Sequence, residues 1–129
     1  MTLKELSKYH DIKVEVDDLQ RRIYELETTI VKASKYSDTK IDKSITNTSP
    51  TEELAIKLNK LRKTYVGKQI TLTSELEKIE EYLNTINDSE IRTIMRKRFI
   101  DLLTWEQVAE LLHYSNPVPY YKVRKYLGR

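Results

Sequence analysis

The segment YHDIKVEVDDLQRRIYELETTIVKA, residues 9–33, decides the fold, because its apolar residues recur at alternating steps of three and four. Such heptad spacing is typical of a helix that packs lengthwise against another helix. Thr2 and Glu5 have the spacing of a capping box, so this helix is expected to begin near Thr2. The seam consists of Tyr9, Ile12, Val16, Leu19, Ile23, Leu26, Ile30 and Ala33.

A second heptad seam follows residues 49–52, where a serine cap, a proline and a reciprocal glutamate predict a helix start close to Pro50. At about 1.5 Å per residue both helices are too long for a globular chain of this size. They are therefore expected to pack as an antiparallel hairpin, to associate with a second chain, or both. Residues 36–49 are expected to form a flexible connection. The second seam consists of Leu54, Leu58, Leu61, Tyr65, a weak layer at Lys68, Leu72, Leu76, Ile79, Leu83 and Ile86.

The chain after Ile86 is expected to fold into three short helices. Residues 87–89 offer caps for the first helix, and residues 104–107 (TWEQ) form a capping box for the second. Residues 113–115 predict a tight turn, after which Asn116 caps a last helix with Pro117 at its first position. The first of these helices is expected to carry Ile91, Ile94, Met95, Arg98, Phe99 and Leu102 on one face.

The segment LTWEQVAELLHYSNPVPYYKVRKYL, residues 103–127, has the pattern of a helix-turn-helix. Ala109 is small where two helices cross closely, and Val108 and Leu112 fill the core beside it. The last helix is basic, and arginine and lysine suit phosphates and guanine edges. The predicted DNA contacts are Arg96, Lys97, Arg98, Asn116, Tyr120, Tyr121, Lys122, Arg124, Lys125 and Arg129. The alternative is that the aromatic residues only fill the core and the lysines only face solvent.

The distribution of charge supports contact with a polyanion. Residues 92–129 carry eight basic and three acidic residues, which gives +5, whereas residues 1–91 carry 15 basic and 17 acidic residues, which gives −2. The two parts sum to the net charge of +3. The positive charge therefore belongs to the C-terminal segment.

The run IRTIMRKRFIDLLTWEQVAELLHYS, residues 91–115, resembles the fourth-region helix-turn-helix of sigma-seventy-type factors. More closely, the chain resembles the ArpU and RinA type of late-gene regulators encoded by phages and prophages of Gram-positive bacteria. The resemblance covers roughly residues 88–127, and it implies a transcriptional regulator of phage genes in the bacterial cytoplasm. In the alternative of a protein-binding module, the partner is expected to be RNA polymerase or a host factor.

The chain departs from that pattern at residues 116–119 (NPVP), where the family continues into a polar, basic helix start. The apolar positions expected ten and thirteen residues after Ala109 fall on Pro119 and Lys122. Either the turn is one residue shorter, so that Val118 and Tyr121 take those positions, or the last helix is rotated.

Composition argues against several other classes of protein. Only two Gly and three Pro occur, with 39% hydrophobic and 33% charged residues, which is typical of long solvated helices. The sequence has no cysteine, no signal peptide and no apolar membrane span, so a cytoplasmic location is expected. With two histidines, no P-loop and no dinucleotide fingerprint, we expect no enzyme, no metal and no cofactor.

The sequence therefore predicts an all-α protein: a coiled-coil hairpin over residues 1–86 that serves as an oligomerisation arm, then a helix-turn-helix head over residues 87–129. The expected function is sequence-specific binding of double-stranded DNA, as a homo-oligomer and most simply a dimer. The alternatives are a DNA-packaging component of the small-terminase kind and a protein-binding module. The predicted oligomerisation residues are Leu19, Ile23, Leu26, Ile30, Leu58, Leu61, Tyr65, Leu72, Leu76, Ile79 and Leu83.

Overall fold

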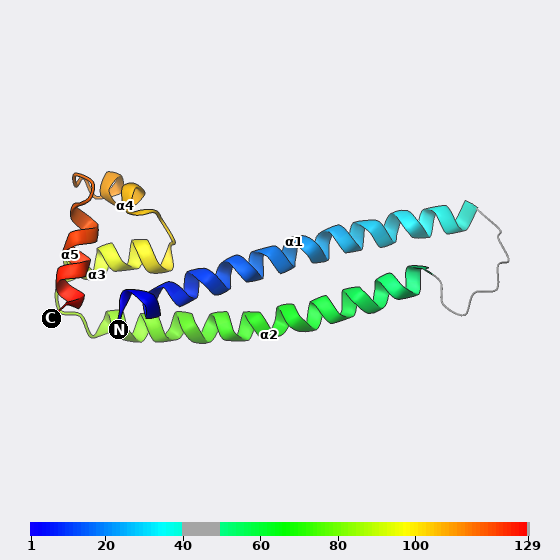
Figure 1. Cartoon of the computed structure of the whole chain (residues 1–129), viewed down its shortest axis with the longest axis horizontal. Coiled ribbons are helices and arrows are strands. Elements are labelled where there is room, and N and C mark those ends of the chain that lie inside the picture. The colour runs from blue at the N-terminus through cyan, green and yellow to red at the C-terminus, as the bar shows by residue number, and fades with distance from the viewer. Residues whose placement is uncertain (40–49, 129) are drawn as a thin grey trace. The chain divides into compact units, whose positions relative to one another are not determined.

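The computed structural model describes residues 1–39 and 50–128, and its regular elements there are all helices, which confirms the predicted fold class (Figure 1). Helix α1 continues through Thr39, so the predicted flexible connection was wrong for residues 36–39, and its remaining residues lie outside those described. The elements are α1 (Leu3–Thr39), α2 (Pro50–Asn84), α3 (Ser89–Met95), the π-helix η1 (Arg96–Ile100), α4 (Trp105–Leu111) and α5 (Val118–Leu127).

The predicted starts of the two long helices are confirmed. The Thr2 backbone N–H donates to Glu5 Oε2 at 3.0 Å, and the Glu5 N–H donates to Thr2 Oγ1 at 3.2 Å, which completes a capping box before α1. Helix α2 begins at Pro50, where proline is tolerated because its missing N–H would have no partner in the first turn. The predicted cap Ser49 lies outside the described residues.

Residues 14–70 form one compact unit, in which α1 and α2 run antiparallel. Glu15 Oε2 pairs with Lys68 Nζ at 2.6 Å, and Glu27 Oε1 pairs with Arg62 Nη2 at 2.9 Å. A later residue of α1 therefore pairs with an earlier residue of α2, as antiparallel helices require. Lys68, which interrupts the apolar seam of α2, thus forms an ion pair with α1.

A single chain covers some of the predicted oligomerisation residues fully and the others only in part. The buried ones are Leu58, Leu72, Ile79 and Leu83. The half-buried ones are Leu19, Ile23, Leu26, Ile30, Leu61, Tyr65 and Leu76.

Residues 1–13 and the chain from Thr71 onward form a second compact unit, so the last part of α2 belongs with the short helices. The compact units therefore divide elsewhere than at the predicted boundary after Ile86. This unit holds most of the core: Leu6, Tyr9, Leu72, Ile79, Leu83, Ile86, Ile91, Ile94, Met95, Phe99, Val108, Ala109, Pro119 and Val123 are buried.

The first short helix was expected to continue to Leu102, but its α-helical part ends at Met95. Asp88 caps α3 by accepting from the backbone N–H groups of Glu90 and Ile91. From Arg96 to Ile100 the helix widens into π geometry, in which the Asp101 N–H donates to the Arg96 carbonyl five residues back. Leu102 then adopts φ of 59°, in the left-handed region, and reverses the chain toward α4.

Helix α4 begins and ends with recognisable caps. The Thr104 and Gln107 capping box is formed in both directions, as predicted. At the other end His113 adopts φ of 61°, its N–H donates to the Glu110 carbonyl, and the Tyr114 N–H donates to the Ala109 carbonyl. These bonds make a Schellman motif in which histidine occupies the left-handed position that glycine usually takes.

The predicted start of the last helix was one residue too early. Asn116 does not cap it; α5 begins at Val118, Pro117 occupies the cap position without a side-chain cap bond, and the Asn116–Pro117 peptide is cis. Pro119 is the second helical residue, where its lack of an N–H leaves no intrahelical bond unmade. Six residues therefore separate the two helices rather than a three-residue turn.

Replacement of the buried Ala109 by glutamate tests the prediction that two helices cross closely at this residue. Ala109 is 2% exposed, so Ala109→Glu is expected to place an unpaired charge in the core and to lower the free energy of unfolding by about 3–5 kcal/mol. Urea unfolding followed by circular dichroism measures the change. Glu110→Gln, on the exposed neighbour, is the control, and equal midpoints for both variants would contradict the placement.

Candidate nucleic-acid interface

Burial of two residues decides which side of α5 faces solvent. Pro119 and Val123 are four residues apart, lie on one face and are buried, and α5 contacts both α3 and α4. Tyr121, Arg124 and Lys125 fall on the opposite face by helical spacing, and all three are exposed. The last helix is therefore rotated relative to the pattern expected from the sequence, and the alternative with Tyr121 in the core was wrong.

The outward face of α5, which we define as Tyr121, Arg124 and Lys125, is cationic. No acidic residue occurs between Val118 and Leu127. The Arg124 guanidinium comes within 3.5 Å of the Tyr120 hydroxyl, and among the described residues no ion pair involves Arg124 or Lys125. Both cations lie in the last turn, where the helix dipole favours positive charge.

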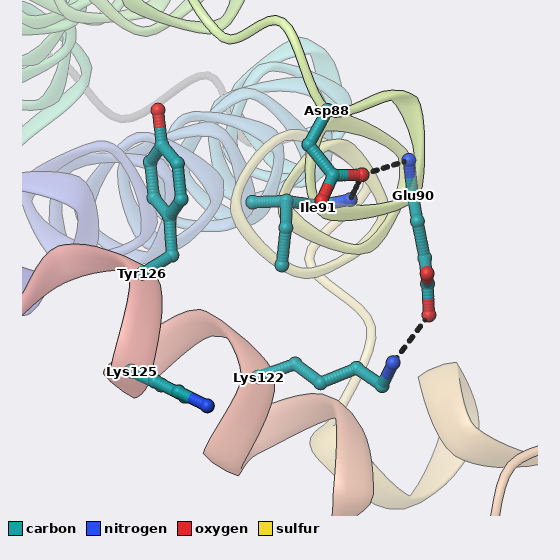
Figure 2. A pocket seen from close by; sticks show the side chains of 6 residues that line it. All are labelled: Asp88, Glu90, Ile91, Lys122, Lys125 and Tyr126. Atoms are coloured by element: carbon teal, nitrogen blue, oxygen red, sulfur yellow. Dashed lines mark hydrogen bonds and ion pairs between the residues drawn. The ribbon is translucent and has the colours of Figure 1, made fainter.

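Lys122 lies at the edge of this face and points back into the protein. Its Nζ donates to Glu90 Oε1 at 2.7 Å, and Tyr114 Oη donates to the same oxygen (Figure 2 shows the lysine bond). The bond from Lys122, followed by that from Tyr114, lowers the pKa of the Glu90 carboxyl, while the bond to Glu90 raises the pKa of Lys122. No ion pair joins Lys125 to the other residues drawn in Figure 2.

Two of the predicted phosphate contacts are engaged by carboxylates. Arg96 Nη1 donates to both oxygens of Glu80, at 3.1 and 2.9 Å. Lys97 Nζ pairs with Asp101 Oδ2 at 3.2 Å. Both cations remain partly exposed, so these pairs are weak and a phosphate group can compete for them.

Arg98 holds the loop before α4. Its Nη1 donates to the Leu103 carbonyl at 2.8 Å, and its guanidinium carbon lies 5.2 Å from the centroid of Trp105. Burial lowers the pKa of this guanidinium. Arg98 is therefore turned toward the protein and contributes to the stability of the helix-turn-helix.

Four aromatic rings form a chain through this unit. Phe99 and Trp105 meet edge to face at 5.9 Å, Trp105 and Tyr120 at 5.4 Å, and Tyr120 and Tyr121 at 5.6 Å. The chain begins with a buried ring and ends on the exposed Tyr121. Trp105 and Tyr120 thus fill space between helices, whereas Tyr121 is presented outward.

The structure brings only some of the predicted contact residues together. Tyr121, Arg124 and Lys125 share one face of α5, and Asn116 is exposed just before that helix. Arg129 lies outside the described residues.

Glu90 and Tyr114 were not among the predicted functional residues. No local spacing could have found them, because Lys122 lies 32 residues beyond Glu90 in the chain.

No family model, curated protein or solved structure matches this chain. In the described ranges, no helix is both long and apolar enough to cross a membrane. Among the same residues, no group of three or more His, Asp or Glu side chains is placed to hold a metal ion. The resemblance to phage regulators therefore stays a prediction from the sequence.

The bonds that Glu90 accepts from Lys122 and Tyr114 make the stability of the fold depend on pH. Because the folded pKa of Glu90 is lowered, its contribution is present above the ordinary glutamate value of 4.5 and is lost as pH falls through the lowered pKa. Glu90→Gln is expected to melt below the parent at pH 7, and the two melting temperatures should converge in acid. Glu81→Gln, on an exposed residue, is the control and should show no such convergence. A difference in melting temperature between Glu90→Gln and the parent that does not change with pH would contradict the proposed contribution of Glu90.

Arg98→Lys separates a structural role from a phosphate contact. Lysine keeps the charge but lacks the planar group that bonds the Leu103 carbonyl and lies over Trp105, so the free energy of unfolding is expected to fall by about 1–2 kcal/mol. Urea unfolding measures this loss. Arg124→Lys, on an exposed arginine, should change it by less than about 0.5 kcal/mol; an equally small effect at Arg98 would show that its contacts add little.

Proposed function

We propose that the protein binds double-stranded DNA through the outward face of α5. The observation that carries the proposal is that this face is cationic, that α5 itself contributes no acidic residue to it, and that α5 is the second helix of a helix-turn-helix. In such motifs the second helix enters the major groove. Arg124 and Lys125 would contact phosphates or guanine edges, and Tyr121 would contact a phosphate or a base methyl.

The remaining cations take secondary positions in this proposal. Arg96 and Lys97 would reach phosphates by exchanging their carboxylate partners, and Lys122 would add to the local positive potential while bonded to Glu90. Arg98 would act indirectly, by holding the loop that positions α4.

We further propose that the protein is a transcriptional regulator of phage genes in the bacterial cytoplasm. This part of the proposal is supported by the resemblance of residues 88–127 to late-gene regulators and by the helix-turn-helix arrangement of α4 and α5. It requires that binding depend on base sequence, because phosphate contacts alone carry no sequence information.

Removal of the two outward cations tests the proposal. The double variant Arg124→Ala, Lys125→Ala is expected to weaken duplex binding and to reduce the slope of log affinity against log salt by about 0.9 for each phosphate group that is no longer bound. Fluorescence anisotropy with a random-sequence duplex from low to moderate salt measures both quantities. Lys57→Ala, Lys60→Ala, on exposed lysines of α2, is the matched control. No binding by the parent at low salt would reject DNA binding as the function. Equal losses of affinity in both double variants would show that the outward face of α5 is not the DNA-binding surface.

A second candidate function is binding of another protein, such as RNA polymerase. It is favoured by Leu111, which is 51% exposed on α4 beside an open hollow of about 500 Å³ lined also by Leu103, Gln107 and His113. Selection from random duplexes distinguishes the two functions: a recovered consensus supports sequence-specific DNA binding, and recovery of none together with no duplex binding at low salt supports the protein-binding role.

A further inference from the structure

The unit formed by residues 14–70 leaves much of its apolar surface exposed. In the described part of this unit only Val16 and Leu58 are fully buried apolar residues, whereas the other unit holds the remaining core. Two helices alone cannot enclose a seam, because each side chain is covered from one side only. The half-buried seam residues thus remain in contact with water.

Large apolar side chains also lie outside the seam. Of the nine large hydrophobic residues that the structure exposes in the described ranges, six belong to this unit. Tyr24 is 70% and Ile70 67% exposed. The six are Val14, Tyr24, Val31, Ile56, Val66 and Ile70.

Helical spacing places four of these six toward one side of the antiparallel pair, with Ile70 farthest from the seam. Val31 follows Tyr24 by seven residues on α1, and Val66 and Ile70 follow Arg62 at steps of four on α2, so each set forms a stripe. Tyr24 and Arg62 line the same hollow of about 380 Å³, together with Ile23 and Tyr65. We define this side, with Tyr24, Val31, Val66 and Ile70, as the open face.

The charges of the two helices are complementary. Residues 14–39 of α1 carry six acidic and four basic residues, a net −2, and residues 50–70 of α2 carry two acidic and five basic residues, a net +3. A face with one acidic and one basic helix matches a copy of itself turned so that α1 lies on α2 of that copy. A two-fold axis parallel to the helices gives this match, whereas a perpendicular axis brings α1 onto α1 and like charges together.

We propose that the open face is covered by a second copy of the chain, in a four-helix bundle where α1 of one copy lies on α2 of the other. The hydrophobic gain comes from the exposed stripes and the half-buried seam, and the charge pattern selects the direction. The corresponding ends of the two copies of residues 14–70 then lie at the same end of the bundle. This inference does not depend on DNA binding.

The test begins with molar mass from light scattering after size-exclusion chromatography. The parent chain is expected to be a dimer, and the double variant Tyr24→Glu, Val66→Glu to raise the dissociation constant about 100-fold or more. Leu111→Glu places one such charge on an exposed leucine of the other unit and should leave the dimer intact. A monomeric parent, a larger ring or an unaffected glutamate variant would overturn the proposal.

Cysteine cross-linking tests the arrangement with conservative changes, since the chain has no cysteine of its own. Tyr24 is level with Arg62 in the shared hollow, and Val66 lies one turn beyond Arg62 on α2. When a Tyr24→Cys chain is mixed and oxidised with a Val66→Cys chain, the mixed disulfide is expected to predominate. Predominance of the Tyr24–Tyr24 cross-link, or absence of both from a dimer, would overturn the arrangement while leaving the DNA-binding proposal unaffected.

Discussion

Burial of Val123 beside Pro119 is the constraint on which the candidate interface depends. These two side chains fix the rotation of α5, and a rotation by one residue that turned Lys122 outward would bring Arg124 into the core. Glu90 reinforces the same rotation from outside the core, because it binds Lys122 on one side and Tyr114 from the preceding connection. Apolar packing thus decides which cations are exposed to solvent, and the ion pair between Lys122 and Glu90 favours the same rotation.

The elements that local sequence determines could be predicted. The capping boxes at Thr2 and Thr104, the start at Pro50 and the burial of Ala109 each depend on residues within a few positions of one another. The long seams were visible because a heptad repeats many times.

The connection between α4 and α5 could not be predicted in detail. Its path depends on a histidine in the left-handed region and on a cis Asn116–Pro117 bond, and neither has a unique signature in the sequence. An error of one residue there changes the whole face that the next helix presents. The π geometry of η1 was missed for a similar reason, because the apolar spacing of that segment also fits a regular α-helix.

The charge count of the C-terminal segment was correct but incomplete. Glu80 and Glu90 precede the counted segment in sequence, yet they bind Arg96 and Lys122. A net charge for a stretch of chain ignores carboxylates that folding brings to it from elsewhere. What distinguishes Arg124 is its position on the outward face, where no ion pair involves it among the described residues, whereas Lys125 lines a pocket together with Asp88 and Glu90.

Trp105 is the only tryptophan of the chain, and it lies in the unit that contains α4 and α5. Its indole is bracketed by Phe99, Tyr120 and the Arg98 guanidinium, so its emission is sensitive to the packing of these helices alone. The far-ultraviolet ellipticity, in contrast, reports helix in both units, because each of the two long helices extends through both of them. The protein therefore carries a built-in optical probe for one unit, and the two signals can reveal whether the units lose their structure together or in succession.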